Sequence, residues 1–290
     1  MNNKELMEGW ARRHAERIVR EREEALKKPK TPEVKAEDEQ EEIAGEKGVV
    51  ITPSSDAFFL EGDYGKEFLK EYNGIVKIDY SDNSVLKVLN WNEEGNIVTG
   101  SSDYSVVLAN KIFRDRGEKV RTANSSDLAE ILKAGRLDLK GYYEDAGLVL
   151  RTLTKVNEYL AGVLYEDIKQ KKGNVKMPFM ISLSDLELKI DPNSPSKLAF
   201  VSGENANPIY SDKFNHANNQ RKFNETDEYG LPIFIQNGKR TWYTREDGLA
   251  GFYLVRGLDL GSVDGGLRNS AADARVVVVR CAEDEKNGRE

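Results

Sequence analysis

The chain has 290 residues, a formal net charge of −7 and a single cysteine, Cys281. This length is enough for one sizeable domain with a substantial core, together with an extension. The acidic balance argues against a general binder of nucleic acid, which would carry clustered Lys and Arg. A lone cysteine excludes an intrachain disulfide, and its place just after a valine run is typical of a small buried hydrophobe.

Targeting and membrane signals are not apparent in the sequence. No apolar run approaches the roughly 20 residues that a spanning helix needs, and no signal-peptide pattern is present. We therefore expect a protein of the cytoplasm by default, with no membrane partner. Display on a cell surface or a virion would leave no mark in the sequence.

Residues 1–47 differ in composition from the rest of the chain. Met7 and Trp10 lie on a narrow apolar stripe of a charged helical segment, which either docks on the domain or a partner, or stays solvated. Thr31–Glu46 is acidic and poor in core-forming residues, as linkers are. The expected organisation is a charged helical or flexible extension with an acidic linker over 1–47, a domain over 48–282 and a flexible tail over 283–290.

The first part of the domain predicts strands. Alternation of apolar and polar residues favours strands over Val49–Thr52, Gly74–Tyr80 and Leu86–Leu89. Gly62–Lys66 lacks the spacing of a phosphate-binding loop and predicts a turn.

Three helices are predicted further along. Val106–Phe113 has an apolar stripe, and Ser126 is placed to cap a following helix that ends at Gly135. Val156–Ile168 predicts the third helix. Between residues 191 and 243 the chain is rich in Asn, Asp, Gly and Pro, which indicates long irregular loops. The expected fold class is α+β.

The segment Phe252–Arg275 has an unusual residue set. It contains no Lys, Glu, Gln, Met or Trp, although Lys and Glu are plentiful elsewhere. Solvent-facing positions normally accept Lys and Glu, so folding alone does not explain this absence. Those five types are the ones that replacement of adenines in AAY codons does not produce. The segment therefore has the signature of adenine-directed mutagenesis within a fixed framework.

The framework follows a period of two. If the segment is extended, its even positions from Leu254 to Ser262 point inward and the odd positions between them point outward. Trp242, just upstream, is outside the reachable residue set and belongs with the framework. The alternative is an ordinary surface loop rich in Gly, Asp, Asn and Ser.

Two upstream segments extend this pattern. Val120–Leu132 is similar to a degraded form of the signature Arg-Leu-Pro-Thr-Glu-Ala-Glu-Trp-Glu, and Ser101–Tyr104, opening a helical stretch through Arg116, resembles the helix before it. With the leucine and serine framework and the final run Arg-Val-Val-Val-Val, the chain resembles the variable proteins of diversity-generating retroelements, especially archaeal ones. These have a C-type lectin fold of the formylglycine-generating-enzyme type.

The resemblance implies a non-enzymatic ligand-binding protein. A reverse transcriptase copies a template with errors at adenine, and the rigid fold displays the variable side chains. The framework positions implied are Trp242, Leu254, Leu258, Leu260, Leu267 and Ser270. The variable, ligand-binding positions implied are Phe252, Tyr253, Val255, Gly257, Asp259, Gly261, Val263, Asp264, Gly265, Gly266, Arg268, Asn269, Ala271, Ala272 and Asp273.

The expected ligand is a macromolecule, most simply a protein. Variable positions spread along strands and loops do not converge as a few polar groups in an apolar pocket, as small-molecule sites do. Phe252, Tyr253 and Arg268 are the expected anchors, because aromatic and Arg side chains dominate binding hot spots. We expect a monomer that binds no nucleic acid. The alternative is a structural or adaptor protein, associated with a virus, that oligomerises through its N-terminal helix.

Enzymatic relatives of this fold use cysteine at copper or several histidines on iron. The chain has only His14, His216 and Cys281 for such chemistry. Asp259 and Asp264 suggest calcium, but no acidic loop supplies the roughly six to eight oxygens that calcium takes. Four further carboxylates, those of Asp103, Asp127, Glu144 and Asp145, are interpreted as caps and surface charges. We expect no metal, no cofactor and no catalytic residues.

Overall fold

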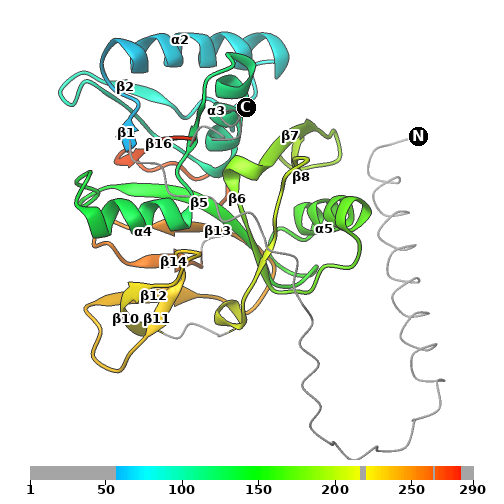
Figure 1. Cartoon of the computed structure of the whole chain (residues 1–290). Helices are drawn as coiled ribbons and strands as arrows, with labels where there is room; N and C mark the ends of the chain where they lie inside the picture. Colours follow the sequence, from blue (N-terminus) through cyan, green and yellow to red (C-terminus); the bar gives the residue numbers. More distant parts are fainter. Residues whose placement is uncertain (1–56, 216–219, 264, 282–290) are drawn as a thin grey trace, which may run out of the picture. The chain divides into compact units, whose positions relative to one another are not determined.

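The computed structural model describes residues 57–215, 220–263 and 265–281. In this part of the chain the fold is mixed α/β, with four α-helices and a curled main sheet (Figure 1). The helices are α2 (Gly62–Asp79), α3 (Asp103–Asp115), α4 (Ser125–Ala134) and α5 (Glu158–Lys172). Two short 3-10 helices are η1 (Leu183–Asp185) and η2 (Asp212–Phe214).

The main sheet has nine strands. Eight lie in the order β11 (Pro232–Phe234), β10 (Arg221–Thr226), β12 (Arg240–Thr244), β14 (Leu260–Ser262), β13 (Leu249–Leu254), β5 (Tyr143–Leu150), β6 (Phe179–Ser182) and β9 (Ile209–Tyr210). The ninth, β15 (Ala274–Arg275), pairs with β5. Pairing is antiparallel except between β12 and β14 and between β15 and β5. Segments far apart in the sequence thus share one sheet, and β5 and β13 lie at its centre.

Smaller sheets complete the strand structure. β16 (Val277–Arg280) lies between β1 (Ala57–Phe59) and β4 (Val120–Thr122), so the two ends of the described chain pair with each other. Two hairpins are formed by β2 (Asn90–Asn92) with β3 (Ile97–Thr99) and by β7 (Leu186–Ile190) with β8 (Leu198–Ser202).

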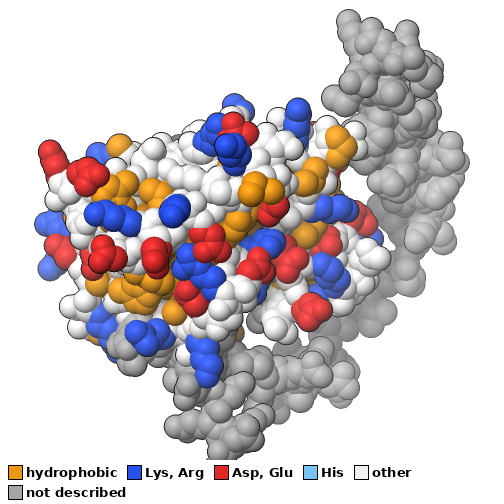
Figure 2. Space-filling model, turned by 90° about the horizontal axis from the view of Figure 1, so that it is seen from above, with side chains coloured by type: hydrophobic (Ala, Val, Ile, Leu, Met, Phe, Trp, Pro, Cys, Tyr) orange, Lys and Arg blue, Asp and Glu red, His pale blue; other side chains and the backbone are white. Residues whose placement is uncertain are grey.

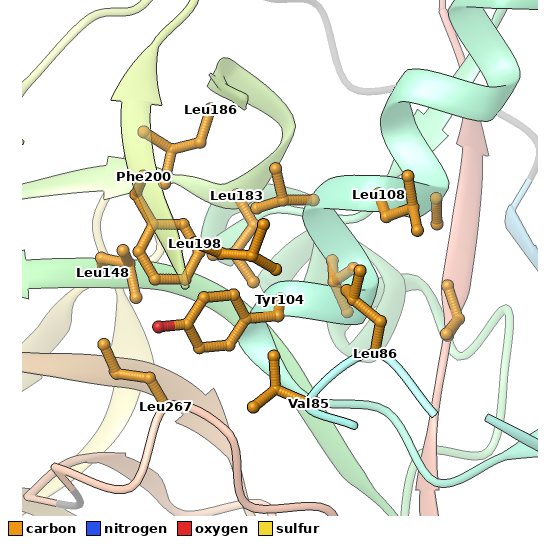
Figure 3. Close-up of a cluster of buried hydrophobic side chains, with 14 of the residues drawn as sticks. Val85, Leu86, Tyr104, Leu108, Leu148, Leu183, Leu186, Leu198, Phe200 and Leu267 are labelled. Carbon is orange, nitrogen blue, oxygen red and sulfur yellow. The ribbon is translucent and has the colours of Figure 1, made fainter. Parts of the chain in front are cut away.

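Buried side chains form two clusters, and β5 contributes to both. Leu148 and Leu150 belong to a cluster with residues of α2, α3 and α5, whereas Val149 belongs to a second cluster around Trp242. Successive strand residues face opposite sides, so a strand covered on both faces carries an uninterrupted apolar run. Figure 3 shows the first cluster, in which the rings of Tyr104 and Phe200 lie 4.5 Å apart.

The predicted helices are confirmed, with changes at their ends. α3 begins after Ser102, whose side chain forms a capping box with Ser105. α4 is capped by Asn124 and not by Ser126, because the Asn124 side chain accepts from the backbone N–H of Asp127 while the Asp127 carboxylate accepts from the N–H of Asn124. α5 begins two residues later than predicted, since Asn157 before it has φ 53°.

Two predicted strands are wrong. Gly74–Tyr80 is the last part of α2, whose buried residues Phe68, Leu69, Tyr72 and Val76 recur at helical spacing. Ile78, one of the apolar residues of that alternating run, is 79% exposed. Leu86–Leu89 forms turns, and the predicted turn at Gly62–Lys66 is the first part of α2. The helical spacing of buried residues extends over more of the chain than the short alternating run does. The whole segment therefore folds as a helix.

Other expectations are corrected or lie outside the described residues. The side chain of Cys281 is exposed, because the chain leaves β16 at this point while its backbone N–H still bonds Lys119. The region 191–243 contains the short strands β8 to β12. The strand at Val49–Thr52, the extension and linker over 1–47, the tail over 283–290 and both histidines lie outside the described residues.

The surface of the domain mixes both charges. On the face seen in Figure 2, Lys and Arg side chains alternate with Asp and Glu, and hydrophobic side chains gather between them. Among the helices that the structure describes, none is long and apolar enough to cross a membrane.

The cap of α4 gives a test. Asn124→Ala should lower the free energy of unfolding by about 1 kcal/mol, because it removes the side chain that satisfies a first-turn N–H. Ser126→Ala, at the position predicted from sequence, should cost no more than about 0.5 kcal/mol. Urea titration of both variants measures the difference, and equal losses would contradict the assignment of Asn124 as the cap.

Candidate functional site

The segment Phe252–Arg275 does not run as one extended strand. β13 ends at Leu254 and β14 begins at Leu260, and a turn joins them in which the N–H of Leu258 bonds the carbonyl of Val255. Leu258 has φ 66° and is half-buried. The predicted alternation therefore fails beyond Leu254: Arg256 is exposed although an inward direction was expected, and Gly261 is buried although an outward direction was expected.

Most framework positions are either buried in one of the two clusters or hydrogen-bonded to another part of the chain. Trp242, Leu254 and Leu260 are buried in the second cluster, and Leu267 is buried beside Tyr104 in the first (Figure 3). Ser270 is exposed, but its hydroxyl donates to the carbonyl of Gly100 at 2.6 Å. The loop before β15 is thus attached to the core by a leucine and to a neighbouring turn by a serine.

The variable positions divide by exposure. Gly257, Arg268, Asn269 and Ala272 are exposed, whereas Val255, Asp259, Val263, Gly265, Gly266, Ala271 and Asp273 are partly exposed. Tyr253 and Gly261 are buried, and Asp264 lies outside the described residues. The prediction that Phe252 is a surface anchor is wrong: its ring is fully buried, 5.7 Å from that of Trp242.

A cavity of about 150 Å³ lies beside this segment. It is lined by α3, β5, β13 and the loop before β15, through Asp103, Tyr143, Asp145, Gly251, Tyr253, Gly266, Asn269, Ser270 and Ala271. Four positions predicted as variable and one predicted as framework are therefore brought together with residues from upstream parts of the chain.

A bulge in β5 directs Asp145 into the cavity. Phe252 and Tyr253, which are consecutive in β13, pair with Gly147 and Asp145, so Ala146 is an additional residue in β5. An additional residue changes which side the following strand residues face, and such bulges are frequent beside functional sites. Asp145 consequently lies on the same side of the sheet as Tyr253, and Phe252 faces the second cluster.

Close packing of aromatic rings and glycines shapes the cavity. The rings of Tyr143 and Tyr253 are stacked with centroids 4.8 Å apart. A Cβ on Gly261 would lie 2.4 Å from the Tyr253 ring, and a Cβ on Gly251 would lie 2.9 Å from the Asp103 carboxylate. Both glycines are needed so that these side chains can occupy their positions.

The cavity is negatively charged. Asp103 and Asp145 contribute carboxylates, and among the described residues of the lining there is no Lys or Arg. The hydroxyl of Ser101 donates to Asp145 at 3.0 Å. Burial, together with the negative charge of neighbouring Asp103, raises the pKa of Tyr104 to about 12 against the opposing effects of a hydrogen bond with Ser196 and the charge of Arg268. Within the part of the chain that the structure describes, no three His, Cys, Asp or Glu side chains form a metal-binding group.

The interpretation of Asp103, Glu144 and Asp145 as caps and surface charges is wrong. Asp103 is 4% exposed and Glu144 is 2% exposed. Two acidic residues directly before the buried run Ala146–Leu150 are a sequence signal for carboxyl groups inside a sheet. Tyr143 offered no comparable signal.

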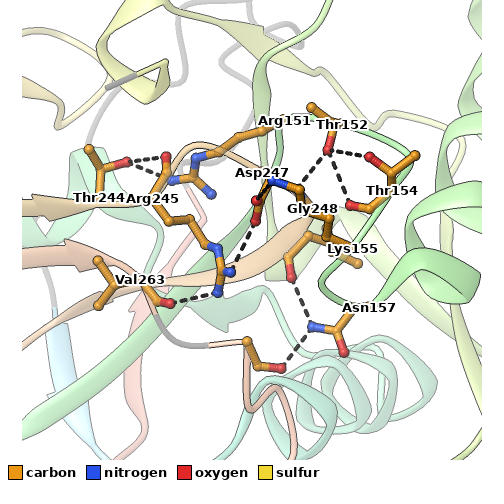
Figure 4. Close-up of polar contacts among 12 residues, drawn as sticks. Arg151, Thr152, Thr154, Lys155, Asn157, Thr244, Arg245, Asp247, Gly248 and Val263 are labelled. Atoms are coloured by element: carbon orange, nitrogen blue, oxygen red, sulfur yellow. Dashed lines mark hydrogen bonds and ion pairs between the residues drawn. The ribbon is translucent and has the colours of Figure 1, made fainter. Parts of the chain in front are cut away.

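One buried and two partly buried polar side chains hold the start of the variable loop (Figure 4). Three successive attachments are made to its backbone carbonyls: Arg151 donates to Ser262 at 2.9 Å, Arg245 to Val263 at 3.0 Å and Asn157 to Gly265 at 2.7 Å. Burial, followed by the charge of Arg245, lowers the pKa of Arg151 to about 9, so its guanidinium stays charged at neutral pH. The carbonyls of Ser262, Val263 and Gly265 are therefore each held by a different side chain.

The burial of Phe252 predicts that this position does not vary freely. Phe252→Ala should lower the free energy of unfolding by about 3–5 kcal/mol, because it opens a cavity beside Trp242. Arg268→Ala, at another predicted anchor, should change it by no more than about 0.5 kcal/mol because the side chain is exposed. Denaturant titration compares them, and a tolerant Phe252 would refute its place in the core.

Glu144 predicts a pH dependence of stability. Burial, followed by the negative charge of Asp145, raises the pKa of Glu144 well above its ordinary value of 4.5. Between pH 4.5 and its raised pKa, Glu144 is protonated in the folded state and ionised in the unfolded state. Its contribution to the free energy of unfolding therefore decreases as the pH rises from 4.5 through that raised pKa.

Glu144→Gln, which mimics the protonated form, should therefore be more stable than the parent protein at pH 8, with a smaller difference at pH 4. Glu94→Gln, at an exposed position, is the matched control and should follow the parent curve. Unfolding midpoints in urea between pH 4 and pH 8 test this, and parallel curves for the parent and Glu144→Gln would contradict it.

Searches with the chain find no matching family model, no matching curated protein and no matching solved structure. The function has to be inferred from the cavity, from the exposed positions around it and from the residue set of the segment that supplies them.

Proposed function

We propose that this chain is a non-enzymatic ligand-binding protein whose binding surface is diversified by adenine-directed retroelement mutagenesis. The observation that carries the proposal is the meeting of four variable positions, Tyr253, Gly266, Asn269 and Ala271, around one cavity. Exposed Arg268 and Ala272 continue the same loop. Substitution on such a surface changes what it contacts.

The separation of roles along the segment supports this proposal. Leu254, Leu260 and Leu267 are buried, so core packing fixes the backbone on both sides of the exposed positions. Substitutions at exposed positions away from the core usually change stability by no more than about 0.5 kcal/mol. A fixed backbone with replaceable side chains is what a diversified binding site requires.

The finer fold assignment is also a proposal. A C-type lectin fold of the formylglycine-generating-enzyme type is supported by the order of elements: α3, a short strand, α4, long connections and a C-terminal strand β16. The Val120–Leu132 segment, whose sequence carries the resemblance, forms β4 and most of α4.

The proposed ligand is a protein, bound by a monomer of this chain. The cavity of about 150 Å³ is smaller than the roughly 300–1,000 Å³ of typical small-molecule sites, and the exposed variable positions extend beyond it. A nucleic acid is disfavoured, because phosphates need clustered cations, and the cavity has two carboxylates instead. No catalytic residue, metal or cofactor is part of the proposal.

Randomised libraries test the binding function. AAY codons diversify six positions: Val255, Gly257, Gly266, Arg268, Asn269 and Ala272. A matched library diversifies six exposed positions elsewhere: Asn73, Lys77, Asp79, Lys87, Glu93 and Glu94. We expect both libraries to stay folded and the first to give more binders against a panel of purified proteins, because only it includes residues that line the cavity and the exposed positions that continue the same segment.

Equal yields from the two libraries, or unfolding of the first, would refute the proposed binding surface. Diversification itself is checked separately in the DNA beside the gene. A near-repeat of the codons for 252–275 that differs at adenines, together with a reverse transcriptase gene, is the expected finding.

A further inference from the structure

We propose that the cavity binds a cationic group, the guanidinium or ammonium group of a single Arg or Lys side chain on a partner protein, and that all variants of this chain share this preference. The inference rests on the proposed function, and it adds the chemistry of the contact. It follows from which residues of the cavity can change, from its size and from its charge.

The floor of the cavity is constant. Asp103, Tyr143, Asp145 and Gly251 precede the variable segment and are not changed by its diversification. We call these four constant residues the floor, and we call the lining residues that belong to the segment the rim: Tyr253, Gly266, Asn269, Ser270 and Ala271. Both carboxylates belong to the constant set. Mutagenesis of the segment therefore alters part of the lining while the two carboxylates stay the same.

The size of the cavity selects one small group. A volume of about 150 Å³ holds roughly five water molecules at about 30 Å³ each. The planar head of an Arg side chain or the ammonium group of a Lys side chain fits such a space, whereas a folded element of a partner does not. The rest of the partner would lie on the exposed loop residues around the entrance.

The charge of the floor selects a cation. Two carboxylates that share a partly enclosed space favour a group that can donate several hydrogen bonds to both, and Arg does this with a planar fork of N–H donors. Tyr143, which is constant, adds aromatic surface that attracts cations through the ring face, and in this variant Tyr253 stacks on it. The basic residue of the loop before β15, Arg268, is exposed and is not among the residues that line the cavity.

Binding of a small probe to the intact chain tests the inference. N-acetyl-arginine methylamide is titrated while the aromatic resonances of Tyr143 and Tyr253 are followed by NMR. The matched probe is the citrulline derivative, which has nearly the same shape and no charge. We expect saturable shifts with the arginine probe and about tenfold weaker binding of the citrulline probe, because a charge-assisted contact is lost.

Variants separate the floor from the rim. Asp145→Asn and Asp103→Asn should each weaken arginine binding by about tenfold, while Asn269→Ser at the rim should retain the preference for arginine over citrulline. Two aspartate variants are used so that one remains informative if the other is unfolded by circular dichroism. The preference surviving in both folded aspartate variants would overturn the inference.

Other outcomes are equally decisive. Equal affinity for the two probes, no shift with arginine, or shifts with methyl mannoside in place of arginine would each overturn the cationic preference. Library binders that bind the Asp145→Asn protein equally well would refute this inference and leave the proposed function standing. Arginine binding without any library binders would refute the proposed function and leave this inference standing.

Discussion

The pairing of β5 with β13 is the interaction on which the rest of the domain depends. It joins Leu249–Leu254 to most of β5, and both strands contribute side chains to the two buried clusters. Because both faces of the sheet are covered, neither face is exposed to solvent and available for polar residues. The two carboxyl groups of β5 consequently lie inside the protein: Asp145 lines the cavity and accepts from Ser101, whereas one buried oxygen of Glu144 has no hydrogen-bond partner.

The bulge at Ala146 interrupts this regular burial at one point. Before it, Asp145 lies opposite Tyr253, and after it, Gly147 lies opposite Phe252. If Ala146 were instead paired with Tyr253 in a regular register, strand alternation would turn Asp145 toward the other face. One inserted residue thus accounts both for the acidic floor of the cavity and for the burial of its neighbour Glu144.

Much of the helical structure could be predicted from the sequence. The apolar stripe of α3 and Gly135 after α4 are local signals, and local signals suffice for helices. Three of the framework leucines are buried as the pattern implied. The predicted alternation of inward and outward side chains failed in the same segment. It assumes one unbroken strand, whereas the chain turns after Leu254.

The cavity could not be predicted in the same way. Its floor joins the first residue of α3 to β5, and nothing local in the sequence indicates that residues 103 and 145 are neighbours. Phe252 was misplaced for a related reason. A large aromatic residue inside a segment of small polar residues suggests an exposed anchor, but the register with β5 turns it toward Trp242.

Glycine contacts limit how independently the segment can vary. At Gly261 any side chain would meet the ring of Tyr253, and at Gly265 it would meet Val156, with a Cβ 2.3 Å from a methyl carbon. Real Cβ atoms do not approach other atoms this closely, so the neighbour has to move or change. Val156 lies outside the segment and is fixed, whereas Tyr253 lies inside it. A larger residue at 261 therefore requires a smaller one at 253, so position 261 can change only together with Tyr253, while exposed Arg268 and Ala272 can change alone.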